Sequence, residues 1–384
     1  MPQAVSRIFL TTSSLSLMLM QEHAKQQAQK EDNSFLILDR IPMRESVVRA
    51  ILQTSSLYPH SEQLNMSLAM STQATFRPSL TKRLTREFKD KPGFKQVYQF
   101  LYHRQQKRIL QEWKVELQKH MEAWPLHDEI EIYAQPMIKL RSIIAGLFPK
   151  AKIIYFEHGL GDYMDARAKL KKDKDFYGLF GEEANNYFPE TGFMPLHVNL
   201  SDHVASFAQA FPEVREAFEA IPKDLPWVLL ATQPLEEFLI PNSFWDDFLA
   251  RLYQHLPEGQ KVRFLIKPHP RQAQDVCDYL LASIHSSGFE AVIWDDPSTQ
   301  HLSLEILFVW MVNHTMAVAS PFSSSVFYLS KLFPKNDISY LYSMRSLSKF
   351  NQKTPPGIKQ RWKVMGNWVE RVFGKDAIDI GLGA

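Results

Sequence analysis

The sequence predicts an α/β fold with two Rossmann-like domains, whose parallel sheets face each other across a central cleft. Its 384 residues are too many for one domain of ordinary size and suit two domains with a core each. Hydrophobic residues make up 45% of the chain and charged residues 22%, as in ordinary globular proteins. Short apolar runs alternate with helix-like segments, a pattern that builds parallel sheets covered by helices.

The chain opens with a strand, a turn and a helix. Residues 7–10 are expected to form a buried strand, residues 11–14 a helix-capping turn rich in hydroxyls, and residues 15–29 the helix. These hydroxyl residues argue against a secretory signal, which the apolar stretch after Arg7 otherwise resembles. No apolar run in the sequence reaches the roughly 18 to 20 residues of a membrane-spanning helix. Further strands are expected at residues 35–38, 129–133 and 151–156.

A domain boundary is expected near residues 221–226, where Pro222 and Pro226 interrupt the helical pattern. We therefore expect three parts: a first Rossmann-like domain at residues 1–222, a second at residues 223–350, and a C-terminal helical segment at residues 351–384 that could pack back on the first domain. Strands of the second domain are expected at residues 227–231, 262–266, 291–294 and 316–319.

Charge and cysteine content limit the partners and the compartment. The net charge of +2 is too small to indicate a nucleic-acid partner. Residues 82–119 and 349–373 mix basic with aromatic side chains, which suits an anionic glycan or membrane surface and equally suits ordinary amphipathic helices. The single cysteine, Cys277, is expected to be a packing residue in a reducing cytoplasm. We expect a cytoplasmic protein, with peripheral association with the inner membrane as a hypothesis.

The segment Lys267-Pro268-His269-Pro270 directly follows an expected strand. Its prolines restrict the backbone on both sides of His269 and so fix the position of the imidazole. A histidine can protonate or hydrogen-bond a leaving phosphate near neutral pH, and Lys267 could add positive charge. A histidine that only caps a helix would explain the pattern equally well.

Three serines, Ser323, Ser324 and Ser325, follow the last expected strand and open a helix. Hydroxyls and backbone amides would converge there at the positive end of the helix, an arrangement that suits a phosphate. Serines at helix starts are also common simple caps. A third segment, Glu157-His158-Gly159, places an acid beside a glycine turn at the end of an earlier strand, where ligand sites of parallel sheets lie.

Along the chain the segment that begins at Glu157 comes first, the segment with His269 second and the serines last. In that order, between residues 157 and 325, they resemble the motifs of bacterial sialyltransferases and polysialyltransferases of the GT-B type. Those families share a motif of two acids and a glycine, an HP motif and a serine-pair motif. The resemblance implies an enzyme that transfers sialic acid from CMP-sialic acid to a sugar hydroxyl of a bacterial surface glycan, such as a capsule or lipooligosaccharide. It also implies inversion at the sugar and no metal or other cofactor. The first domain would then bind the glycan acceptor and the second the CMP-sugar donor.

The resemblance also assigns roles to individual residues. Glu157 would be the general base that takes the proton of the acceptor hydroxyl. His269 would protonate or neutralise the departing CMP phosphate, whose oxygens the serines 323–325 would hold. Lys267 and Glu305 would help to bind the nucleotide.

One departure from the family pattern leaves the base open. The second acid of the first motif is replaced here by His158, which could itself be the base or could orient Glu157; Gly159 completes the motif and Asp162 is a nearby carboxylate. We rank Glu157 first because an ionised carboxylate needs little tuning of its pKa to accept a proton. The pair Asp295-Asp296, which precedes Pro297, is interpreted as a turn and not as a metal site.

Two alternatives remain open at this point. Another CMP-activated acid sugar, such as Kdo, legionaminic or pseudaminic acid, would need the same nucleotide contacts. A non-catalytic module that binds nucleotide or glycan could keep the same fold. The expected partners are the CMP-sugar donor, the glycan acceptor and an anionic membrane surface, with no nucleic acid.

Overall fold

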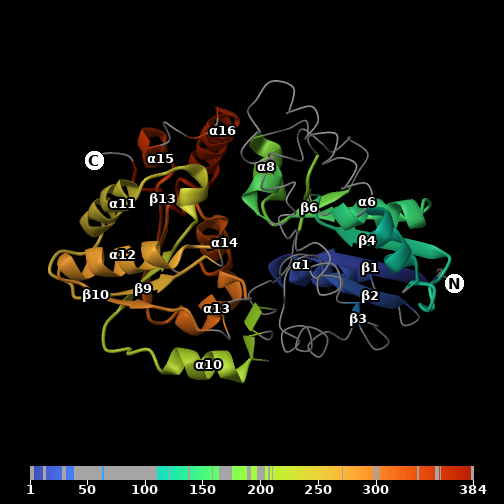
Figure 1. The fold of residues 1–384 in the computed structure, drawn as a ribbon, viewed down its shortest axis with the longest axis horizontal. Helices are drawn as coiled ribbons and strands as arrows, with labels where there is room; N and C mark the ends of the chain where they lie inside the picture. The colour runs from blue at the N-terminus through green and yellow to red at the C-terminus, as the bar shows by residue number, and fades with distance from the viewer. Residues whose placement is uncertain are drawn as a thin grey trace, which may run out of the picture.

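The computed structural model describes a chain of two halves, each built on a parallel sheet (Figure 1). The described residues are 4–11, 14–27, 32–38, 63–64, 110–119, 121–136, 139–157, 159–163, 175–187, 192–196, 204–205, 208–209, 211–269, 271–296, 299, 302–334, 337–350, 354 and 356–381. Of the residues of the expected capping turn, Thr12 and Ser13 lie outside this set, as do most of the basic and aromatic residues of segment 82–119.

The first half holds a seven-stranded sheet in the order β3-β2-β1-β4-β5-β6-β7, with every neighbouring pair parallel. Its strands are β1 (Val5–Thr11), β2 (Asn33–Leu38), β3 (Gln63–Leu64), β4 (Glu129–Ala134), β5 (Lys152–Phe156), β6 (Phe176–Gly178) and β7 (Met194–Pro195). Helices α1 (Ser14–Gln27), α6 (Lys139–Leu147) and α8 (Gly181–Tyr187) belong to this half.

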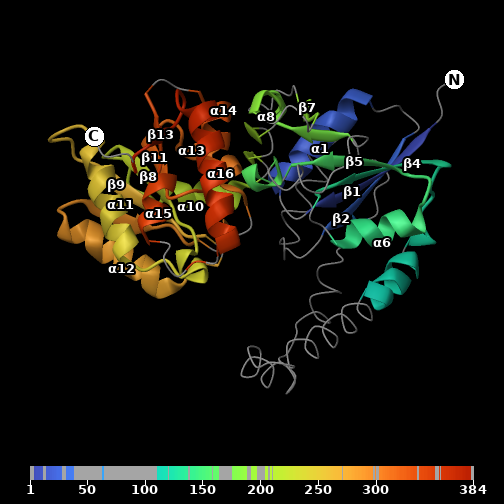
Figure 2. The ribbon, with the colours of Figure 1, turned by 90° about the horizontal axis from the view of Figure 1, so that it is seen from above.

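Helices cover both faces of this sheet, which is why β1 is buried along its whole length. Phe9 packs in one core cluster with Met18 of α1, whereas Ile8 points to the other face and packs in a second cluster with Ile144 of α6. Figure 2 shows α1 and α6 on opposite sides of the strands. The continuous apolar run at the start of the chain is therefore explained by a strand with no solvent-facing side.

The second half holds a six-stranded parallel sheet in the order β10-β9-β8-β11-β12-β13. Its strands are β8 (Trp227–Ala231), β9 (Arg263–Lys267), β10 (Glu290–Ile293), β11 (Thr315–Ser320), β12 (Ser339–Tyr342) and β13 (Ile378–Asp379). Its helices are α10 (Pro212–Glu219), α11 (Ser243–Gln254), α12 (Gln274–Ser286), α13 (Leu304–Met311), α14 (Ser324–Leu332), α15 (Met344–Phe350) and α16 (Pro356–Phe373). Cys277 is buried on α12, which confirms the packing role expected for it.

All eight strands expected from the sequence are present within a residue or two of the expected bounds. The predicted division at residues 222 and 350 stays a prediction. Among the described residues no helix is both long and apolar enough to cross a membrane.

Each sheet has a buried arginine in an ion-pair group at the amino-terminal end of its strands. Arg7 on β1 contacts both Asp32 and Glu131, and Arg263 on β9 contacts Asp224 at 2.6 Å and Glu290 at 2.5 Å. Each guanidinium is compensated by two acids, and removal of both would leave a buried positive charge unpaired, which is strongly destabilising. These charges lie at the end opposite to the carboxyl edge, so we assign them to the fold and look for the site at the other edge.

The two halves meet along α8, α14 and α16, which lie side by side in both views (Figures 1 and 2). The ring of Phe180, which directly precedes α8, lies tilted against Tyr328 of α14 and edge-on to Phe373 of α16. The ring centroids are 5.0 Å and 4.8 Å apart, respectively. An ion pair of 2.6 Å joins Lys331 to Glu183 across the same contact. Helix α16 therefore packs against the first half as well as the second.

Candidate active site

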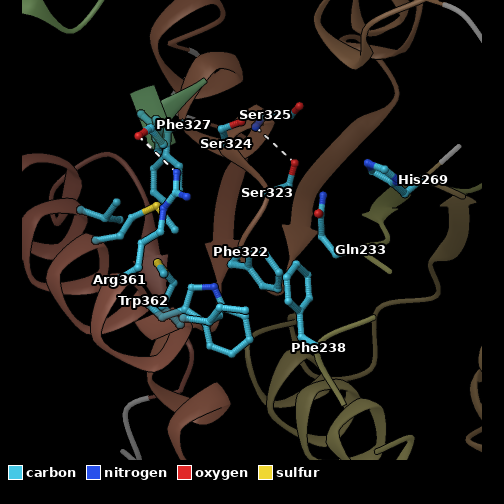
Figure 3. A pocket seen from close by; sticks show the side chains of 16 residues that line it. Gln233, Phe238, His269, Phe322, Ser323, Ser324, Ser325, Phe327, Arg361 and Trp362 are labelled. Atoms are coloured by element: carbon cyan, nitrogen blue, oxygen red, sulfur yellow. Dashed lines mark hydrogen bonds between the residues drawn. The ribbon is translucent and has the colours of Figure 1, made fainter. Parts of the chain in front are cut away.

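A cavity of about 500 Å³ opens where the two halves meet (Figure 3). Most of its lining comes from the carboxyl edge of the second sheet and from α16, and the first half contributes Leu160 and Gly161. The residues that line it are Leu160, Gly161, Gln233, Phe238, His269, Phe322, Ser323, Ser324, Ser325, Phe327, Met344, Ile358, Arg361, Trp362, Met365 and Val369.

The strand order explains why segments far apart in sequence meet at this cavity. Strand β8 lies between β9 and β11, so the chain leaves β8 toward one side and returns later on the other. Such a point of reversal is where parallel sheets bind ligands. Gln233 follows β8, His269 follows β9 and Ser323 follows β11, and all three line the cavity.

Two hydrogen bonds fix the position of His269, one made by its backbone amide and one by its ring. Its amide donates to the Thr232 hydroxyl at 2.9 Å, and its ring Nδ1 accepts from the Arg271 amide at 3.1 Å. Burial, with a smaller contribution from Arg271, lowers the pKa of His269 to about 4. The ring is therefore neutral near pH 7, and because Nδ1 accepts, the ring proton is on Nε2 and can be donated to a ligand.

The three serines lie at the start of α14 and line the cavity. Ser323 is the N-cap of α14, and its hydroxyl accepts from the Ser325 amide at 3.3 Å. Ser323, Ser324 and Ser325 also line the cavity. The positive end of α14 thus faces the cavity together with three hydroxyls, a combination suited to a phosphate.

Lys267 and Glu305 do not belong to the cavity lining as far as the described residues show. The Lys267 ammonium donates to the Thr299 hydroxyl at 3.2 Å and lies 5.5 Å from the centre of the Trp294 ring. Burial lowers its pKa to about 8, although the nearby Asp295 and Asp296 act in the opposite direction. Glu305 is buried in the first turn of α13. The nucleotide-binding roles of Lys267 and Glu305 stay predictions.

Glu157 follows β5 and has only 1% of its surface exposed. One carboxyl oxygen accepts from the Leu179 amide at 2.5 Å, the other accepts from the Tyr328 hydroxyl at 2.7 Å, and Tyr163 donates a further hydrogen bond to the carboxylate. Burial raises the pKa of Glu157 to about 7, against these three hydrogen bonds, which lower it. Glu157 is not among the residues that line the cavity.

The neighbours of Glu157 lie close to the serine motif. His158 is outside the described residues, whereas Gly159 lies against Ser324: a Cβ at Gly159 would come within 3.3 Å of the Ser324 hydroxyl oxygen. Asp162 is buried, and its amide donates to the Gly159 carbonyl at 2.9 Å. The first and third predicted motifs therefore meet across the two halves, which no spacing in the sequence reveals.

Sequence reasoning did not single out Gln233, Arg361, Tyr163 or Tyr328 as functional. Gln233 and Tyr163 lie inside segments next to the predicted strand ends, so their positions carried a signal. Arg361 was visible only as one charge of the basic tail. Tyr328 had no signal, because its partner is 171 positions away in the chain.

Comparison of the chain with known protein families identifies one family that matches it. The family model for alpha-2,8-polysialyltransferases (POLYST) matches residues 8–342. A search of curated protein sequences found no match to the chain.

Solved structures that are similar to the chain have little sequence identity to it. A UDP-GlcNAc 2-epimerase from Methanocaldococcus jannaschii has a TM-score of 0.52 and 9% identity over 95% of this chain and 92% of its own. The structure of the epimerase from that organism in complex with UDP-GlcNAc and UDP gives 0.50 and 10% over 96% and 99%. A sialyltransferase from Photobacterium damsela gives 0.48 and 12% over 98% and 81%. The two epimerase structures confirm the predicted fold of two Rossmann-like domains of the GT-B kind.

Proposed function

The chain belongs to the alpha-2,8-polysialyltransferase family, and from that membership we propose that it transfers sialic acid from CMP-sialic acid to a sugar hydroxyl of a bacterial surface glycan. Membership makes it a glycosyltransferase of the sialyltransferase type. We propose in addition that the donor is CMP-sialic acid, that the transfer inverts the configuration at the anomeric carbon and that no metal is required. The observation that carries it is the cavity in which His269 and the serines 323–325 meet at the end of α14.

The phosphate of CMP fits the end of α14. There the backbone amides and the serine hydroxyls supply hydrogen-bond donors, and the helix dipole favours an anion. The Nε2–H of His269 would donate to a phosphate oxygen that gains charge as the sugar leaves. Because the pKa of His269 is about 4, the imidazole would act near pH 7 as a neutral donor and not as a cation.

The proposed reaction is a single displacement. The acceptor oxygen forms a bond to the anomeric carbon of sialic acid while the bond from that carbon to the CMP phosphate oxygen breaks. The bonding electron pair leaves on the phosphate, and the hydroxyl proton goes to a base. Attack from the face opposite to the phosphate inverts the configuration at that carbon.

Glu157 is the residue that we propose as the base. Burial raises the pKa of Glu157 to about 7 in the closed structure, and exposure to water would lower it toward its ordinary value. Near neutral pH the opened site would therefore hold an ionised carboxylate that can accept a proton. The Glu157 carboxylate is buried between Leu179 and Tyr328, so an acceptor hydroxyl can reach it only after the contact between α14 and the first half opens. The proposal thus includes a separation of the two halves before the acceptor binds.

No divalent cation is needed in this scheme, because CMP has a single phosphate and the amides of α14, the serine hydroxyls and His269 supply donors for it. We also propose a cytoplasmic enzyme that acts at the inner membrane on a capsule or lipooligosaccharide acceptor. Flotation with anionic liposomes tests the membrane contact, and protein that stays at the bottom of the gradient would count against it.

The deciding experiment is CMP release by the purified protein from CMP-Neu5Ac, with and without a panel of galactosides and sialosides. We expect acceptor-dependent release and a product heavier than the acceptor by one sialic acid. Release only from CMP-linked Kdo, legionaminic or pseudaminic acid would replace the donor in the proposal. Binding of CMP without turnover of any donor would refute the proposed reaction.

A further inference from the structure

Arg361 lies on the face of α16 that lines the cavity. The α16 residues in the lining are Ile358, Arg361, Trp362, Met365 and Val369. Their spacings of three, four, seven and eleven residues from the first place all five on one side of a helix. Four of the five are apolar, so Arg361 is the one charged side chain that this helix presents to the cavity. Figure 3 shows Arg361 among the side chains that line it.

The guanidinium of Arg361 lies at the boundary of the two halves. Its Nη2 donates to the Gly161 carbonyl at 3.4 Å. A Cβ at Gly161 would come within 2.8 Å of the same nitrogen, so any side chain at this position would push the guanidinium away. The close approach therefore requires glycine at position 161, and it holds the charge beside a residue that itself lines the cavity.

The described lining of the cavity favours anions at two separate places, the end of α14 and Arg361. Among the described lining residues there is no aspartate or glutamate, and the titratable side chains are His269 and Arg361. The pKa of about 4 leaves His269 neutral near pH 7, so the permanent positive charge of this lining is Arg361. The end of α14 already suits a phosphate, whereas Arg361 comes from a different helix.

We propose that Arg361 binds the carboxylate of an acid sugar in this cavity. A guanidinium presents its N–H groups in a planar fork that matches the two oxygens of a carboxylate. This inference rests on the proposed function, in which both substrates can carry such a carboxylate: the sialic acid of the donor and a terminal sialic acid of the acceptor. The chemistry of recognition is the same for both sources, and the experiment separates them.

The test compares ligands with and without the carboxylate in variants of Arg361. For the acceptor arm, the probes are sialyllactose and the same trisaccharide with its carboxyl group reduced to an alcohol, with binding measured by calorimetry. For the donor arm, they are CMP-sialic acid and the same nucleotide sugar with its carboxyl group reduced to an alcohol. We expect the unaltered protein to prefer the carboxylate in one arm by roughly 10-fold or more, as a charge-assisted hydrogen bond allows.

Arg361→Met keeps an unbranched stem without the charge and should abolish that preference, leaving the carboxylate and its uncharged counterpart equally weak. Arg361→Lys should retain a reduced preference, because an ammonium keeps the charge but lacks the fork. Lys363→Ala is the matched control, since Lys363 is exposed on the same helix and does not line the cavity. We expect this control to bind all four probes like the unaltered protein.

A preference for the carboxylate that persists unchanged in Arg361→Met would overturn the proposal, and so would the absence of any preference in the unaltered protein. If Arg361→Met does not fold, Arg361→Lys decides the matter, because a preference as large as in the unaltered protein would show that the fork is not used. The binding arms do not depend on turnover. A protein that prefers the carboxylate but releases no CMP would therefore refute the proposed function and leave the role of Arg361 intact.

Discussion

The hydroxyl of Tyr328 donates a 2.7 Å hydrogen bond to the carboxylate of Glu157 across the contact between the two halves. Tyr328 lies on α14, the helix whose first residues line the cavity. One short helix therefore contacts both the expected phosphate position and the proposed base. A movement of α14 that follows donor binding would be transmitted directly to the surroundings of Glu157.

Tyr328→Phe should shift the acidic limb of the pH profile. The hydrogen bond from Tyr328 favours the charged carboxylate and lowers the pKa of Glu157, so its removal should raise that pKa. If Glu157 is the base, the limb of kcat/KM on the acidic side moves to higher pH, and stability falls by about 1 kcal/mol. Tyr340→Phe is the control, because that hydroxyl donates to the Phe333 carbonyl and not to Glu157. A profile that does not move in Tyr328→Phe argues against Glu157 as the base.

Glu157 should make the fold less stable as the pH rises. Its pKa is raised from 4.5 to about 7 in the folded protein, so the folded state binds the proton more tightly than the unfolded state. The stabilisation is fully present below about pH 4.5 and is lost as the pH rises through about 7, a change of about 3 kcal/mol.

Glu157→Gln removes the titrating group and should flatten this dependence. Denaturant unfolding at about pH 5 and about pH 7.5 measures it in both proteins. A decline of the same size in Glu157→Gln would show that other groups cause it. The same variant should have lost turnover, since an amide cannot accept the proton.

His269→Ala should lower kcat by roughly 100-fold or more, the size expected for a group that assists a leaving phosphate. His255→Ala, at an exposed histidine of the same half, should leave kcat unchanged. Because the pKa of His269 is about 4, the pH profile of the unaltered enzyme should show no inflection near 6.5 that belongs to this residue. Such an inflection, present in the enzyme and absent from His269→Asn, would contradict a neutral donor.

Treatment with EDTA should leave the rate of CMP release unchanged, because the proposed contacts to the phosphate are supplied by protein groups. The measurement is the initial rate before and after chelation and after the addition of Mg²⁺ or Mn²⁺. A rate that collapses with EDTA and returns with either cation would mean that the reaction requires a metal.

The sequence predicted the long strands because burial on both faces leaves a continuous apolar run, as in β1 and β8. It missed β6 and β12, which lie inside their sheets, and also β3, β7 and β13, which have two residues each and lie at the edges of their sheets. Such short strands form only because a neighbour is already in place, so no local pattern predicts them.

The candidate site was predictable where polar side chains directly follow the end of a strand. His269 and the serines 323–325 were found in this way, and the strand order then brings them to one cavity. The burial of Glu157 was not predictable, because it depends on Tyr328 from the other half. Arg361 was not predictable, because the C-terminal segment has several basic residues and only the packing of α16 determines which of these faces the cavity.

Of the described residues around the cavity, all but Leu160 and Gly161 belong to the second half of the molecule, including those of α16. Strand β13 connects α16 to the second half, because it follows α16 in the chain and pairs with β12 of the second sheet. If the halves swing apart, α16 and Arg361 travel with the proposed nucleotide site, while the Tyr328–Glu157 bond and the contact of Arg361 with the Gly161 carbonyl break. The proposed donor pocket would thus keep most of its lining together in the second half, so a nucleotide sugar that binds before the acceptor would meet these residues already in place.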